Sequence, residues 1–129
     1  MSFTLHKSDN SSVLPWEYIP GTEGSYQAGQ LVNVVNGQLA PITADQTTTP
    51  PYLCMADVAL PAGELLPVSR VNRDCIYETT LAAAAASAAV GAKLQVAAGG
   101  LEAKAGAGTF EIVSLDGTEA GDAARGRWV

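Results

Sequence analysis

Apolar and polar residues alternate in short runs along most of the chain, and glycine, proline or asparagine separates the runs. Alternation with a period of two over four to eight residues is typical of β-strands with one buried face. The clearest pair is Leu31–Val35 and Gln38–Ile42, joined by Asn36-Gly37. Asn-Gly readily supplies both positive φ angles of a type I′ turn, so we predict a β-hairpin here.

The same alternation predicts a second hairpin and several further strands. The second hairpin lies within Gly91–Ala103 and turns at Ala98-Gly99-Gly100. Pro67 should place its strand at a sheet edge or in a bulge, because proline donates no backbone hydrogen bond. The further strands are expected at residues 52–58, 64–71, 75–79, 109–115 and 123–129. About seven to nine short strands with glycine-bearing turns predict a mainly β fold, a small β-barrel or sandwich.

One segment favours a helix. Residues 80–90 are rich in alanine, which has the highest helix propensity, and Thr79 or Thr80 could cap the first turn. Gly91 stands where a left-handed residue commonly ends a helix. We therefore expect one short connecting helix.

Residues 1–24 are polar and rich in turn formers, and we expect them to form an extended N-terminal arm before a single β-rich domain of residues 25–129. Prolines bound the segment Pro15–Pro20, which disfavours a central strand. Trp16 and Tyr18 would anchor the arm. They either pack against their own domain or reach a neighbouring subunit, and the sequence favours neither alternative.

Composition excludes several function classes. The chain has 129 residues, 47% of them hydrophobic but only 6% aromatic, and much of the apolar content is alanine. Such a thin core gains stability from association. A net charge of −6 argues against nucleic acid as the principal partner. No apolar run could span a membrane, and the N-terminus lacks a signal pattern, so we expect synthesis in the cytoplasm.

No set of residues predicts catalysis, a cofactor or a metal. The nearest carboxylates, at positions 116, 119 and 122, lie in a polar turn and loop. Cys54 and Cys75 lie in apolar surroundings and are expected to be small buried side chains, since a histidine partner and a CxxC motif are lacking. We therefore expect a protein that is not an enzyme.

The C-terminal tail predicts a second contact surface. On a strand, Arg125 and Arg127 would share one face, and Trp128 stands next to them. Arginine and tryptophan are enriched at protein interfaces, although Trp128 could instead close the end of the barrel. The predicted oligomer or capsid interface therefore comprises Trp16, Tyr18, Arg125, Arg127 and Trp128.

Two segments carry a family resemblance: AGQLVNVVNGQLAPIT (residues 28–43) and, after the alanine-rich stretch, VGAKLQVAAGGLEAKA (residues 90–105). With the polar N-terminal arm, they resemble the capsid cement, or head decoration, proteins of tailed bacteriophages and prophages. The resemblance implies a barrel-like fold and a homo-oligomer, with a trimer favoured. It also implies that the major capsid protein is a partner and that the protein lies on the outer surface of the virion capsid. It implies no catalytic residue and no cofactor.

Two rival functions belong to other classes. One is a glycan- or protein-binding β module, in which exposed Tyr26, Tyr52 and Tyr77 would stack on sugar rings. The other, a more distant alternative, is a small hydrolase that uses the acidic residues.

Overall fold

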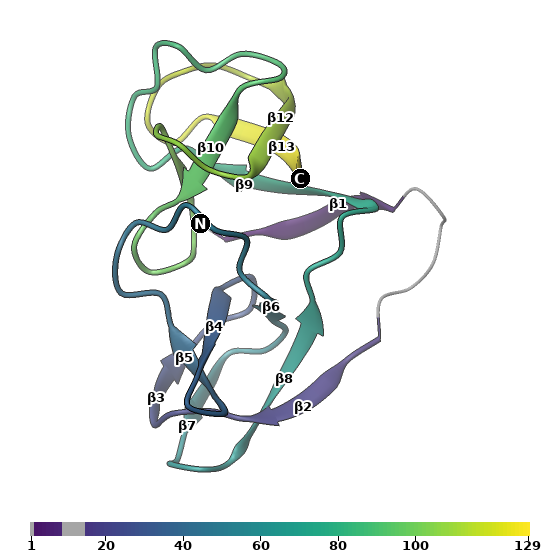
Figure 1. Cartoon of the computed structure of the whole chain (residues 1–129), viewed down its shortest axis with the longest axis vertical. Coiled ribbons are helices and arrows are strands. Elements are labelled where there is room, and N and C mark those ends of the chain that lie inside the picture. The colour runs from purple at the N-terminus through teal and green to yellow at the C-terminus, as the bar shows by residue number, and fades with distance from the viewer. Residues whose placement is uncertain (1, 9–14) are drawn as a thin grey trace.

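The computed structural model describes residues 2–8 and 15–129, and these residues form thirteen strands in three antiparallel sheets. The sheets are a six-stranded sheet of order β1-β9-β13-β12-β10-β11, a five-stranded sheet of order β2-β8-β6-β4-β5, and the pair β3-β7 (Figure 1). The strands are β1 (Thr4–Ser8), β2 (Glu17–Pro20), β3 (Gly24–Tyr26), β4 (Leu31–Val35), β5 (Gln38–Pro41), β6 (Tyr52–Cys54), β7 (Val58–Leu60), β8 (Leu65–Arg70), β9 (Cys75–Thr80), β10 (Lys93–Val96), β11 (Ala103–Lys104), β12 (Phe110–Leu115) and β13 (Ala123–Trp128). The predicted mainly β class is confirmed.

The buried apolar side chains form two hydrophobic cores. In the view of Figure 1, the upper core lies with the six-stranded sheet and the lower core lies with the five-stranded sheet. Strands β4 and β6 contribute to both cores. Successive side chains of a strand point to opposite faces. Leu31 of β4 and its partner Leu53 of β6 therefore pack in the upper core under the six-stranded sheet, whereas Val32 and Cys54 pack in the lower core. Both faces of this pair are buried where the two strands meet, whereas Val34 and Val35 at the other end of β4 are exposed.

The first predicted hairpin is confirmed. Strands β4 and β5 pair in register up to Val35 and Gln38, and the turn residues Asn36 and Gly37 have φ angles of 52° and 78°. The second hairpin is also present, because β10 pairs with β11 and the turn between them contains Gly99 and Gly100, both with positive φ.

The predicted helix is wrong. The alanine-rich segment is an irregular loop after β9, and its backbone amides donate to neighbouring segments: Ala82 to the carbonyl of Ala103 at 2.9 Å, and Ala85 to that of Thr118 at 2.8 Å. A short isolated helix is marginal in water even when it is rich in alanine. Only Leu81 and Ala85 at the start of this segment are buried, so a helix would gain little from packing.

Two strand predictions need correction. The run 52–58 is split into β6 and β7, and β8, which contains Pro67, lies inside its sheet between β2 and β6. Proline is tolerated there because the pairing of β6 with β8 ends at Cys54 and Val68. Pro67 lies one residue beyond the last paired position, so its missing backbone N–H interrupts no pair with β6. The Pro67 carbonyl still accepts the amide of Met55 at 3.0 Å. The strands predicted at 75–79, 109–115 and 123–129 are present as β9, β12 and β13.

Of the two predicted architectures, a closed barrel is not formed. The five-stranded sheet curls until Gly21, the residue after β2, meets β5. Among the described residues, the pairing between these two edges is limited to one parallel bridge, Gly21 with Leu39. The described part of the predicted N-terminal arm forms edge strands, since β1 ends one sheet and β2 ends the other. Phe3 is buried in the upper core, and positions 9–14 of the arm lie outside the described residues.

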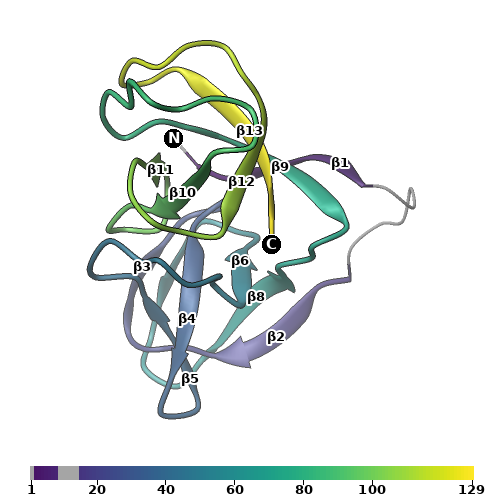
Figure 2. The same cartoon turned by 45° about the horizontal axis from the view of Figure 1, so that its top comes forward.

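The turn of the β10–β11 hairpin joins the two halves of the molecule (Figure 2). The Gly100 carbonyl accepts the Leu31 amide at 2.8 Å, and the Gly99 amide donates to Ile42 at 2.8 Å. Asp45 holds the same hairpin with its carboxylate, which accepts the Ala98 amide at 3.0 Å and the Lys104 ammonium at 2.7 Å. The lysine and then the amide lower the pKa of Asp45 below its ordinary value of 3.8.

We expect Gly100→Ala to destabilise the protein more than Gly91→Ala does. Both glycines have positive φ, so alanine costs about 1–2 kcal/mol at either position. A Cβ at Gly100 would also overlap the carbonyl oxygen of Leu31, at a further cost of about 1–3 kcal/mol, whereas a Cβ at Gly91 meets open space. Urea unfolding would measure both free energies, and equal losses would contradict this account of the junction.

We expect Asp45→Asn to destabilise the protein near neutral pH and to matter little in acid. A carboxyl whose pKa is lowered by folding stabilises the protein above its ordinary value of 3.8, and this stabilisation is lost as the pH falls through the lower folded value. The difference in urea midpoint between wild type and variant should therefore shrink between about pH 7 and about pH 2. Asp74→Asn, at an exposed aspartate, is the control and should change the urea midpoint little at pH 7.

Candidate functional site

Four large apolar side chains are exposed on or next to β1, β2 and β8, the strand that pairs with β2. We call these four side chains the N-terminal edge surface. Trp16 is 51% exposed, Tyr18 61%, Leu65 54% and Leu5 44%. Tyr18 lies on β2, where Pro20 pairs with Leu65 of β8, and Trp16 immediately precedes that strand. Large apolar groups gathered on an edge are typical of an interaction site.

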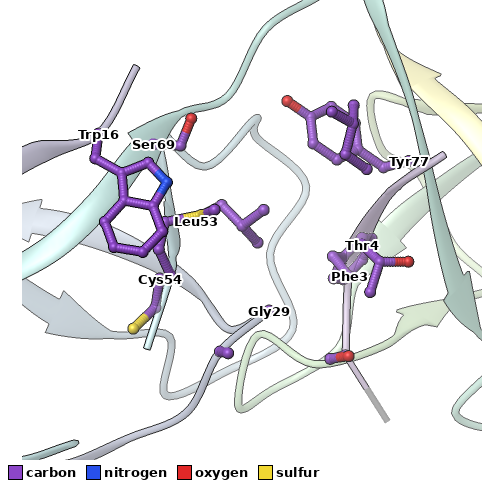
Figure 3. A pocket seen from close by; sticks show the side chains of 12 residues that line it. Phe3, Thr4, Trp16, Gly29, Leu53, Cys54, Ser69 and Tyr77 are labelled. Atoms are coloured by element: carbon purple, nitrogen blue, oxygen red, sulfur yellow. The ribbon is translucent and has the colours of Figure 1, made fainter. Parts of the chain in front are cut away.

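A cavity of about 520 Å³ opens beside this surface, between β1 and the ends of β6 and β8 (Figure 3). Trp16 lines one side, Tyr77 and the residues of β1 line the other, and Leu53 lies between them. Its principal apolar lining residues are Phe3, Leu5, Trp16, Leu53, Met55 and Tyr77. Leu5 and Trp16 therefore belong to both the cavity and the N-terminal edge surface.

The cavity contains two titratable groups, and both are neutral near pH 7. Burial raises the pKa of the Cys54 thiol above 9.0, and the thiol donates a hydrogen bond to the carbonyl of Ala56 at 3.2 Å. Burial likewise raises the pKa of Tyr77 above 10.0, and its hydroxyl accepts the amide of Asn72 at 3.1 Å. A deprotonated, nucleophilic thiolate is therefore disfavoured here.

The C-terminal edge differs from the surface that the sequence predicted. Arg125 is largely enclosed by its own chain: it donates to Ser114 Oγ at 2.6 Å, to Glu78 at 2.9 Å and to Asp116 at 2.6 Å. The two carboxylates, Asp116 first, raise the pKa of this guanidinium. Arg127 is half-buried and lies opposite Glu111 in the β12–β13 pair. Arg125 thus secures β13 between its neighbours.

Trp128 is 1% exposed and belongs to the upper core. Its ring lies 4.8 Å from that of Phe110 and 5.9 Å from that of Phe3, centroid to centroid. This is the internal alternative named from the sequence, although Trp128 fills a core between sheets and not the end of a barrel. The structure therefore separates the five predicted interface residues, and Trp16 and Tyr18 alone among them are strongly exposed.

The tyrosines and cysteines that the sequence offered as candidate site residues are buried in the fold. Tyr26, Tyr52 and Tyr77 are buried, so they do not offer the exposed rings that a glycan-binding module was expected to use. Cys54 and Cys75 are buried free thiols, as predicted. Within residues 2–8 and 15–129, no three histidine, cysteine, aspartate or glutamate side chains gather as a metal site would require. The same residues include no helix long and apolar enough to cross a membrane.

Sequence reasoning missed the contributions of Leu5 and Leu65 and the cavity itself. Phe3 and Leu5 alternate with polar residues, which is a signal for a strand, but this segment was assigned to the polar arm. The cavity has no local signal, because its lining comes from segments far apart in the chain.

Comparison with protein-family models and with curated proteins finds no match.

We expect Arg125→Met to lower the free energy of unfolding by about 1–2 kcal/mol. Hydrogen bonds to charged groups are worth more than neutral ones, but exposure of the Asp116 partner reduces the gain. Arg73→Met is the matched control, since Arg73 is exposed, and it should change stability little. Urea unfolding distinguishes the two, and an unchanged midpoint for Arg125→Met would contradict a structural role.

Proposed function

We propose that this chain is a non-enzymatic structural protein of a tailed-bacteriophage or prophage virion, a decoration protein that binds the capsid lattice as a homo-oligomer. The N-terminal edge surface supplies its contacts. The observation that carries the proposal is the exposure of Tyr18 on edge strand β2 and of Trp16 just before it, together with Leu5 and Leu65. Tryptophan and tyrosine are among the residues that most often dominate binding energy in protein interfaces.

The architecture supports association through edges. Both larger sheets are open, and β1 and β2 stand at the ends of their strand orders. An open edge presents unpaired backbone groups that another chain can cover. On a capsid, many weak copies of such a contact act together and give high avidity without a deep binding site.

The charge of the chain also fits a protein partner. A net charge of −6 opposes binding to nucleic acid, whose phosphates require clustered basic groups. Arg125, one of the basic residues near the C-terminus, is already paired within the chain. The proposed partners are accordingly a second copy of the chain and the major capsid protein, in a virion assembled in the bacterial cytoplasm.

We expect light scattering to give the wild-type protein a mass that is a multiple of 13.2 kDa, and the double variant Trp16→Ser/Tyr18→Ser a mass close to one chain. Both side chains are more than half exposed, so the variant should fold normally by circular dichroism. Val90→Ser is the matched control. Val90 is 69% exposed in the alanine-rich loop, away from the N-terminal edge surface, and its replacement should leave the mass unchanged.

Co-sedimentation with capsids assembled from the major capsid protein of the same viral genome tests the second partner. Wild type and Val90→Ser should pellet with the capsids, and the double variant should remain largely in the supernatant. A wild-type protein that is monomeric at all concentrations and does not pellet would overturn the proposal.

A further inference from the structure

The cavity described above has the size and lining of a small-molecule site. Ligand sites commonly have volumes of about 300–1,000 Å³ and are mostly apolar, with a few polar groups that orient the ligand. This cavity, at about 520 Å³, is within that range and is larger than a single side chain requires. Its walls belong to both halves of the molecule, because Leu5 and Tyr77 belong to the six-stranded sheet and Leu53 belongs to the five-stranded sheet.

The described residues that line the cavity include no charged group. Its polar groups are hydroxyls, one thiol and the indole N–H of Trp16, and its two titratable members, Cys54 and Tyr77, are neutral near pH 7 because burial raises the pKa of each. An ion that entered would lose hydration without finding an opposite charge. The cavity therefore selects against charged molecules.

One buried side-chain polar atom in the described lining has no hydrogen-bond partner. Ser69 of β8 is 2% exposed, and its Oγ makes no hydrogen bond with any described residue. Figure 3 shows its side chain beside Trp16 at the cavity wall. Buried hydroxyls are nearly always hydrogen-bonded, so an isolated one in a cavity wall indicates a position where a bound molecule can supply the partner.

We propose that this cavity binds an uncharged, mainly apolar small molecule that makes one hydrogen bond with Ser69 Oγ. Trp16 forms the rim and covers the bound molecule from the solvent side. The inference does not rest on the proposed capsid role: the two sites share Leu5 and Trp16, but the ligand would occupy the cavity behind the edge.

Two fluorescent probes of nearly the same shape test the proposal. N-phenyl-1-naphthylamine is neutral and has one N–H group that can donate to Ser69 Oγ, and 8-anilino-1-naphthalenesulfonate adds a sulfonate to that framework. Titration at about 0.5 M salt screens the general repulsion of an anion by the acidic protein. The neutral probe should bind saturably with a stoichiometry of one per chain, and the anionic probe should bind at least about tenfold more weakly.

Variants assign the binding to this cavity. Ala28→Phe places a ring at the cavity lining and should weaken the neutral probe at least about tenfold, whereas Ala84→Phe, in the exposed alanine-rich loop, should leave its affinity unchanged. Ser69→Ala removes the lone hydroxyl and should weaken the neutral probe about three- to tenfold. If Ala28→Phe does not fold, Trp16→Ser provides the second test. It changes an exposed side chain and leaves the core intact, and it should also weaken binding of the neutral probe.

Three results would overturn the proposal: no saturable binding of the neutral probe, equal affinity for the two probes, or undiminished binding by folded Ala28→Phe and Trp16→Ser. None of them bears on the light-scattering mass of the wild-type protein. Failure of the ligand site and failure of the oligomer are therefore distinguishable.

Discussion

Leu31 and Val32 are consecutive residues of β4, and their side chains pack in different cores. The same division holds for Leu53 and Cys54 of β6, which pairs with β4. This strand pair is a shared wall: a shift of one residue in its register would exchange the two sets of side chains and disturb both cores at once. The arrangement of the two sheets depends on it.

The wall is held in place by backbone contacts that require close approach. Gly100 comes so near the Leu31 carbonyl that no side chain would fit, and the two residues also share a hydrogen bond. Asp45 adds a polar connection, because its carboxylate binds groups on both sides of the β10–β11 turn. The halves of the molecule are thus joined by directed bonds as well as by apolar packing.

Away from the wall, the sheets leave space. On the side of β1, the two halves separate enough for the cavity beside Ser69, and the N-terminal edge surface lies at its opening. A core poor in aromatic rings fills such a space less completely, and three of the rings, Phe3, Phe110 and Trp128, are committed to a cluster of their own.

Local chemistry in the sequence was sufficient for the first turn and for strands such as β4, β5 and β12. Asn36-Gly37 encodes its own geometry, and the alternation around Phe110 and Ile112 identifies their buried face, because both signals act between neighbours in the chain. The sequence alone could not determine that Trp16 is exposed and that Trp128 is buried, because contacts with distant segments decide which tryptophan is covered. The alanine-rich segment shows the same limit. Its intrinsic preference was for a helix, but hydrogen bonds from Ala82 and Ala85 to residues far along the chain decided its conformation, because tertiary contacts outweigh a propensity of a few tenths of a kcal/mol per residue.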